Sequence, residues 1–105
     1  MAWATNNIVS NPSSGDIIAD TGAIALGGLI QTTVLVWSTI TCNVEIVQRN
    51  ALNTADVNKQ RLYALNSETG ILPIQQVPVL LAVNERLLVR MVDSISGDIQ
   101  ASILT

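Results

Sequence analysis

The chain has 105 residues, enough for one compact domain, and 49% of them are apolar while only 12% are charged. This composition excludes intrinsic disorder, which requires low hydrophobicity and high net charge. The absence of histidine and the single cysteine exclude Ser-His-Asp and Cys-His relays, histidine metal sites and an intrachain disulfide, and a net charge of −3 argues against nucleic acid as a partner.

The first fifteen residues predict a polar N-terminal arm rather than a strand. The turn-forming pair Asn11-Pro12 and the cluster at 13–15 interrupt this segment. We therefore expect an extended arm over residues 1–15 and one domain over residues 16–105. The first residues lack the basic and apolar regions of a signal peptide, which indicates a protein made and kept in a reducing cytoplasm.

A short strand is expected to begin at residues 17–18 and to end at the Asp20-Thr21-Gly22 turn. Residues 21–44 carry no charge, which is a property of membrane spans. Eight of these 24 residues are polar, however, Gly27-Gly28 interrupts them, and no basic residue flanks them. We expect no membrane span, a turn or bulge at the two glycines, and a long buried strand over 29–41.

Residues 44–50 predict another strand, and residues 61–65 and 71–77 two more. Pro73 and Pro78 cannot donate to a ladder of hydrogen bonds, so we expect the last of these strands to be bulged or at the edge of a sheet. A short helix over 51–65 is the alternative for the middle of the chain, but its apolar residues are poorly spaced for one helical face.

The clearest period-two alternation lies near the C-terminus. In residues 86–92 one face carries Leu87, Val89 and Met91 and the other carries Arg86 and Arg90. Residues 98–104 alternate in the same way, with Ile99, Ala101 and Ile103 on one face, and the turn-forming segment 93–97 separates the two stretches. This pattern predicts a hairpin. With the strands above, it gives an all-β chain of roughly seven or eight short strands, which is typical of an antiparallel β-sandwich or jelly roll.

The polar residues are mostly uncharged, with nine Asn, six Gln and 17 Ser and Thr. A free soluble monomer usually carries dense mixed charge, whereas the cores of protein interfaces are depleted in Lys, Glu and Asp. We therefore expect a homo-oligomer that buries apolar surface between subunits. A monomer with neutral loops is the alternative.

The sharpest motif is Asp20-Thr21-Gly22, which resembles the catalytic loop of retroviral-type aspartic proteases. In that family two such loops pair their carboxylates and activate water, so Asp20 would be catalytic and Thr21 its support. The glycine-rich flap of the family is missing, because residues 29–69 contain no glycine. We favour a tight turn in which Asp20 accepts backbone N–H groups and Gly22 has a positive φ.

The other candidate residues favour structural roles. Arg86 and Arg90 share a face and are expected to pair with Glu45, Glu85 or the carboxylate of a partner. Cys42 is expected to be an inert buried thiol. Acidic residues in turns lack the spacing of a calcium loop, so we expect no metal and no cofactor; they are Asp16, Asp20, Glu68, Asp93 and Asp98.

From residue 16 to the C-terminus the chain resembles small β-sandwich proteins of tailed-phage virions, especially capsid decoration (cement) proteins. The resemblance lies in the turn at 20–24, the strand at 44–50, the segment at 83–90 and the closing strand at 97–103. It implies a jelly-roll-like fold, a homotrimer on the outer surface of the phage head, and no catalysis.

We therefore expect a non-enzymatic virion protein that is made in the host cytoplasm and binds the lattice of the major capsid protein. The residues expected to contact this partner are Trp3, Ile8, Val9, Arg86 and Arg90. Two alternatives remain, namely a receptor- or glycan-binding tip domain of a viral fibre and an aspartic protease that uses Asp20.

Overall fold

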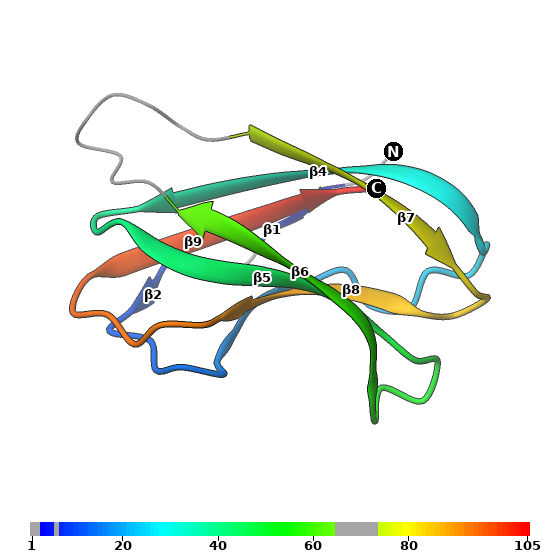
Figure 1. Ribbon diagram of the computed structural model, residues 1–105, viewed down its shortest axis with the longest axis horizontal. Coiled ribbons are helices and arrows are strands. Elements are labelled where there is room, and N and C mark those ends of the chain that lie inside the picture. The colour runs from blue at the N-terminus through cyan, green and yellow to red at the C-terminus, as the bar shows by residue number, and fades with distance from the viewer. Residues whose placement is uncertain (1–2, 6, 65–73) are drawn as a thin grey trace.

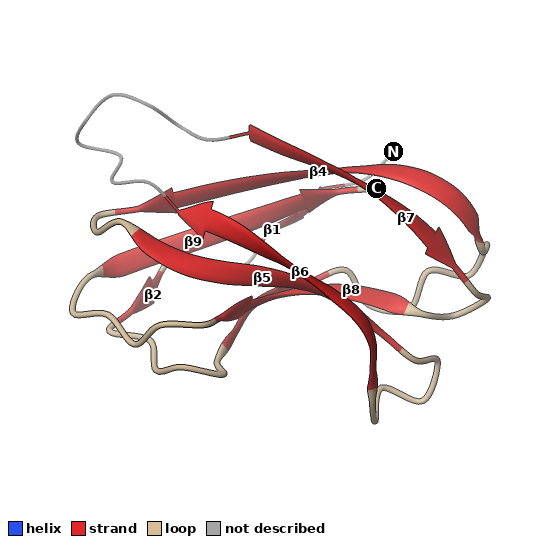
Figure 2. Cartoon of the chain, viewed as in Figure 1, coloured by secondary structure: helices blue, strands red, loops and turns tan. Residues whose placement is uncertain are grey.

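The computed structural model describes residues 3–5, 7–64 and 74–105. The described residues form strands, turns and loops and contain no helix (Figure 2). The strands are β1 (Trp3–Thr5), β2 (Val9–Ser10), β3 (Ile17–Asp20), β4 (Gly28–Ser38), β5 (Cys42–Arg49), β6 (Asp56–Ala64), β7 (Ile74–Leu81), β8 (Arg86–Met91) and β9 (Asp98–Leu104). No described helix is long and apolar enough to cross a membrane.

Two antiparallel sheets pack face to face, so the all-β sandwich predicted from the sequence is confirmed (Figure 1). Sheet A has the order β1-β9-β4-β7, and β2 also pairs with β9. Sheet B has the order β3-β8-β5-β6. Within the described part of the chain, β5 and β6 are the one pair of consecutive strands that bond to each other; the later connections cross between the sheets.

The predicted hairpin between residues 86–92 and 98–104 is wrong, although both strands and their alternation are present. β8 pairs with β3 and β5 in sheet B, whereas β9 pairs with β1, β2 and β4 in sheet A. The connection between them crosses the sandwich, so both apolar rows face one shared core. Side chains of this core that are at most 1% exposed include Leu87, Val89, Met91, Ile99, Ala101 and Ile103.

A short helix was the alternative for residues 51–65, but β6 occupies residues 56–64 of this segment. β6 pairs with β5 along its length, with a bulge between Gln48 and Arg49. The turn before β6 is held by the Asn50 side chain, whose Oδ1 accepts the backbone N–H groups of Thr54 at 2.8 Å and Ala55 at 3.2 Å. These local bonds satisfy the turn without a helical cap, and the poor apolar spacing leaves a helix no face to bury.

The N-terminal segment differs from the predicted arm. β1 and β2 both pair with β9, and the backbone N–H of Asn11 donates to the carbonyl of Gly97 at 2.8 Å. The reason is that β9 has β4 on one side only, and its other edge presents unpaired backbone groups that the first residues satisfy. The polar composition of this segment fits a strand at the edge of a sheet as well as it fits a free arm.

The expected long strand is β4, which ends at Ser38 rather than at residue 41. β7 is the edge strand of sheet A, as its prolines predicted, and Pro78 lies opposite Gln31; Pro73 falls outside the described residues. The two expected turn glycines lie at the start of β4: Gly27 precedes the strand, and Gly28, with a φ of 129°, is its first residue. A Cβ at Gly27 would lie 2.7 Å from the carbonyl oxygen of Leu81, so the close approach of β7 requires glycine there.

Candidate functional site

The outer face of sheet A forms a surface, here called the uncharged face, that faces away from the core. Its side chains alternate with the buried ones along each strand, and among the described residues Asp98 at one end is its one charged side chain. Its large apolar side chains are Trp3, Ile8, Leu29, Leu35, Trp37, Ile74, Pro78, Leu80 and Leu104.

Several of these apolar side chains are strongly exposed. Leu29 is 75% exposed and its cross-strand neighbour Leu80 is 70% exposed, at the end of β4 where the strand begins. Near the other end of β4 lies a shallow hollow lined by Ile8, Leu35, Trp37, Gln100 and Ser102. Contiguous exposed apolar patches of this kind mark interaction sites.

The outer face of sheet B, here called the charged face, has the opposite composition. All five basic residues of the chain point outward from β5, β6 and β8. They outnumber the carboxylates on this face, which belong to Asp20, Glu45 and Asp56. The basic residues are Arg49, Lys59, Arg61, Arg86 and Arg90.

The three arginines of β5 and β8 form ion pairs within the face. Arg90 Nη2 lies 2.6 Å from Glu45 Oε1 and 3.0 Å from Asp56 Oδ2. Arg49 lies 3.3 Å from Asp56 Oδ1. The hydrogen bond from Arg90 lowers the pKa of Asp56, because it stabilises the ionised carboxylate.

Two apolar side chains are buried beneath these charges. Val47 and Leu88 lie opposite each other on β5 and β8, point away from the core, and are 0% exposed. Their neighbours on the face are Glu45 and Arg90 on one side and Arg49 and Arg86 on the other. The aliphatic stems of long charged side chains can cover such a pair while the charged heads stay in water.

Lys59 and Arg61 are the basic residues that remain available. Both are exposed on the edge strand β6 and form no ion pair within the described part of the chain. The charged face therefore presents free positive charge along one edge, whereas its centre is neutralised internally.

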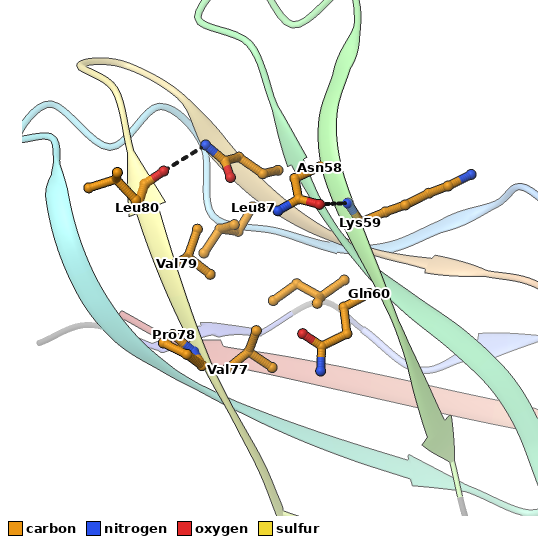
Figure 3. Close-up of a pocket in the computed structure, with 10 residues that line it drawn as sticks. Asn58, Lys59, Gln60, Val77, Pro78, Val79, Leu80 and Leu87 are labelled. Atoms are coloured by element: carbon orange, nitrogen blue, oxygen red, sulfur yellow. Dashed lines mark hydrogen bonds between the residues drawn. The ribbon is translucent and has the colours of Figure 1, made fainter.

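A groove of about 130 Å³ separates the edge strands β6 and β7 (Figure 3). Ile46, Leu87, Val77 and Val79 line it, and the amide side chains of β6 stand at its rim, while Lys59 extends away from it. Lysine on β6 and proline in β7 are features that protect sheet edges from adding another strand.

One polar contact beside this groove was not predicted from the sequence. Gln48 is only 7% exposed, and its Nε2 donates to Glu85 Oε1 at 2.6 Å and to the Leu80 carbonyl at 2.9 Å. Glu85 therefore binds Gln48 and the backbone N–H of Ala82, not the arginines that we expected. The alternation of β5 places Gln48 on the inner face, and this position could have been predicted from Val44 and Ile46. It was missed because Gln48 begins a run of polar residues, 48–50, that we expected to end the strand.

The Asp20-Thr21-Gly22 segment has the two local features that we expected of a tight turn, although the backbone does not reverse there and residues 21–24 continue alongside residues 84–87. Asp20 Oδ1 accepts the backbone N–H of Gly22 at 2.7 Å, and Gly22 has a φ of 69°. Asp20 Oδ2 lies 3.3 Å from Arg86 Nη1, and Thr21 Oγ1 accepts the N–H of Leu87. Asp20 Oδ1 thus closes the segment on itself, whereas Asp20 Oδ2 and Thr21 Oγ1 hold it against β8.

Cys42 lies in the core with 5% of its surface exposed, and burial raises the pKa of its thiol, as expected for an unreactive cysteine. No group of three potential metal ligands occurs among the described residues. Asp16, Asp93 and Asp98 each accept hydrogen bonds from nearby Ser or Asn groups. Glu68, the remaining acidic candidate, falls outside the described residues.

The predicted partner-binding residues lie on different surfaces. Trp3 and Ile8 belong to the uncharged face, whereas Arg86 and Arg90 belong to the charged face on the opposite sheet. Val9 faces inward and packs partly against the core. The sequence identified members of both surfaces without indicating that the sandwich separates them.

Comparisons of the chain with protein families, with curated proteins and with solved structures found no match. Function is therefore inferred from the geometry of the chain itself.

Proposed function

We propose that the chain is a structural virion protein, a capsid decoration (cement) subunit that binds the outer surface of a phage head. The observation that carries the proposal is the separation of its two faces. The uncharged face has the composition of permanent interfaces, and the charged face that of reversible ones. A subunit that assembles with itself and docks on a lattice needs both kinds of surface.

The order of the strands supports a jelly roll as the finer description of the sandwich. With β1 and β2 counted as one strand, eight strands alternate between the sheets except at the β5–β6 hairpin. Sheet A then holds the first, eighth, third and sixth of them, and sheet B the second, seventh, fourth and fifth. Jelly rolls recur in viral capsid proteins and in lectins. The fold alone does not assign a function, so the proposal rests on the different compositions of the uncharged and charged faces.

In this role the protein performs no chemistry. Because it binds the assembled lattice and not the separated capsid subunits, it stabilises the lattice by mass action. The charged face is the surface that docks, and Lys59 and Arg61 are its free contacts for carboxylates of the major capsid protein. Proteins with this role are made in the host cytoplasm and remain on the outside of the virion.

Charge reversal on β6 tests this docking. Arg61→Glu should weaken co-sedimentation with heads stripped of the protein by at least about tenfold, because close like charges across an interface cost several kcal/mol. Gln60→Glu is the control. Gln60 is the neighbouring residue and faces the groove, so a negative charge there lies on the other side of β6 and should change binding little. Binding that is insensitive to salt and to Arg61→Glu would contradict the proposal.

A glycan-binding fibre tip is the second candidate. The observation that favours it is the hollow beside Trp37, where an aromatic ring lies near the amide of Gln100 and the hydroxyl of Ser102. Saccharide binding there would change the tryptophan fluorescence of the protein at millimolar sugar or below, whereas a decoration subunit would show no such response. An Asp20-dependent acid protease would instead cleave peptides, but both Asp20 oxygens already have partners within the chain.

A further inference from the structure

We infer that a second copy of this chain covers the uncharged face, through a two-fold contact in which Leu29 of each copy fills the hollow beside Trp37 of the other. This inference concerns the free protein in solution. It does not depend on the proposed role at a capsid lattice.

The charge distribution argues for a second copy as the occupant. Because Asp98, at one end, is the one charged side chain that the described residues place on the outer face of sheet A, two such faces can meet with little removal of charge from water. Face-to-face packing also leaves both charged faces, with all the basic residues of the two chains, directed outward. A partner with a charged surface would instead bury its own ions against apolar side chains.

The area is sufficient for a specific contact. Each residue of a sheet occupies roughly 16 Å², from spacings of about 3.4 Å along a strand and about 4.8 Å between strands. The strands of sheet A therefore present roughly 500 Å² per copy in projection. Two copies together would bury about 1,000 Å², without counting the additional area of protruding side chains. This is the size that a specific interface requires.

The shape of the face is self-complementary. Leu29 protrudes near the first residue of β4, and the hollow lies beside Trp37 near the last. A two-fold axis that crosses the strands reverses β4 between the copies, so each Leu29 lies over the other copy's hollow. Thr33 stands midway between Leu29 and Trp37, and the axis passes close to it.

This symmetry makes the free protein a dimer rather than the trimer that the phage resemblance implies. A two-fold interface uses the same patch on both copies and is the commonest arrangement of homo-oligomers, whereas a trimer requires two different patches. The uncharged face carries both the protruding Leu29 and the hollow beside Trp37 that would receive it, so one patch is sufficient.

Light scattering at micromolar concentration should give twice the 11.2 kDa mass of the chain. Leu29→Asp should raise the dissociation constant at least tenfold, because a carboxylate would replace an apolar side chain against Ile8, Leu35 and Trp37. Leu52→Asp is the matched control: Leu52 is 80% exposed but lies in the turn between β5 and β6, so the same change there should leave the dimer intact. Circular dichroism verifies that each variant keeps its strands.

Two variants at the axis test the symmetry directly. Thr33→Lys and Thr33→Asp should each give monomers, because each brings two like charges together, and a mixture of the two should form a heterodimer. Both tryptophans lie on this face, so acrylamide quenching of their fluorescence should decrease as the concentration rises. A wild-type monomer or trimer, equal effects of the Leu29 and Leu52 variants, or no heterodimer in the mixture would each overturn the inference.

Discussion

The hydroxyl of Thr32 lies on the inner face of sheet A, where the residue is 0% exposed. No hydrogen-bond partner for Thr32 Oγ1 exists within the described part of the chain. An unsatisfied buried polar group costs about 1–3 kcal/mol, because it gives up water and gains nothing. Thr32→Val keeps the shape of the side chain and removes this cost. We expect it to raise the free energy of unfolding by about 1–2 kcal/mol in chemical denaturation.

Thr33 provides the control for this substitution. It is the next residue on β4, but it points outward between Gln76 and Leu104. Thr33→Val should change stability by no more than about 0.5 kcal/mol, because its hydroxyl is not in the core. If both substitutions stabilise the protein equally, the gain comes from the preference of valine for strands and not from the buried hydroxyl.

Gln48 and Glu85 differ from Thr32 because their polar groups are satisfied. Both are 7% exposed, and the hydrogen bond between them joins β5 to the turn between β7 and β8. Removing one member leaves the other buried without its partner, which is why polar pairs of this kind tolerate truncation poorly. The pair therefore ties β5 to this turn beside the β6–β7 groove, and the bond from Gln48 to the Leu80 carbonyl joins sheet B to sheet A.

At the scale of the strand, alternation made much of the fold predictable from the sequence. Residues 98–104 alternate over seven positions, and β9 occupies those same residues. One row of that strand is fully buried, so no other register satisfies the core. The hydrogen bond between Asp20 and Gly22 was equally predictable, because it is local and depends on neighbouring residues alone.

Strand partners were not predictable from the same pattern. β8 and β9 alternate in the way that a hairpin requires, but alternation describes one face of a strand and not the sheet to which it belongs. β1 and β2 were missed because they are only three and two residues long, and such segments carry no measurable period. What holds them is the free edge of β9, which lies at the far end of the chain.

Ile8 and Val9 test whether the N-terminal segment is held as a strand. Val9 lies opposite Ile99 and packs against the core, whereas Ile8 is 53% exposed on the uncharged face. Val9→Ala should therefore reduce the free energy of unfolding by about 1 kcal/mol, and Ile8→Ala by at most about 0.5 kcal/mol. Urea unfolding at dilutions where the protein is monomeric measures both. Equal effects would mean that the segment is a free arm.

At the scale of the whole molecule, the composition predicted that subunits bury apolar surface against each other, but it did not indicate which face of the molecule is involved. The low charge is a sum over the chain, whereas the separation of faces depends on the direction in which each strand points. A single register places Arg49, Arg86 and Arg90 on one side of β5 and β8, and the core takes the other side. Sheet A, with no basic residue in any described strand, then becomes the uncharged face.

The topology also predicts how fast the molecule folds. The first strand pairs with the last, β4 pairs with β7 and β9, and one described pair of strands is local. Long loops must close before these contacts gain free energy, so folding should take from about a millisecond to about a second. Stopped-flow fluorescence of the two tryptophans in dilute protein measures this time. A fluorescence change that is complete within the mixing time of the instrument would mean that local structure, and not the pairing of distant strands, limits folding.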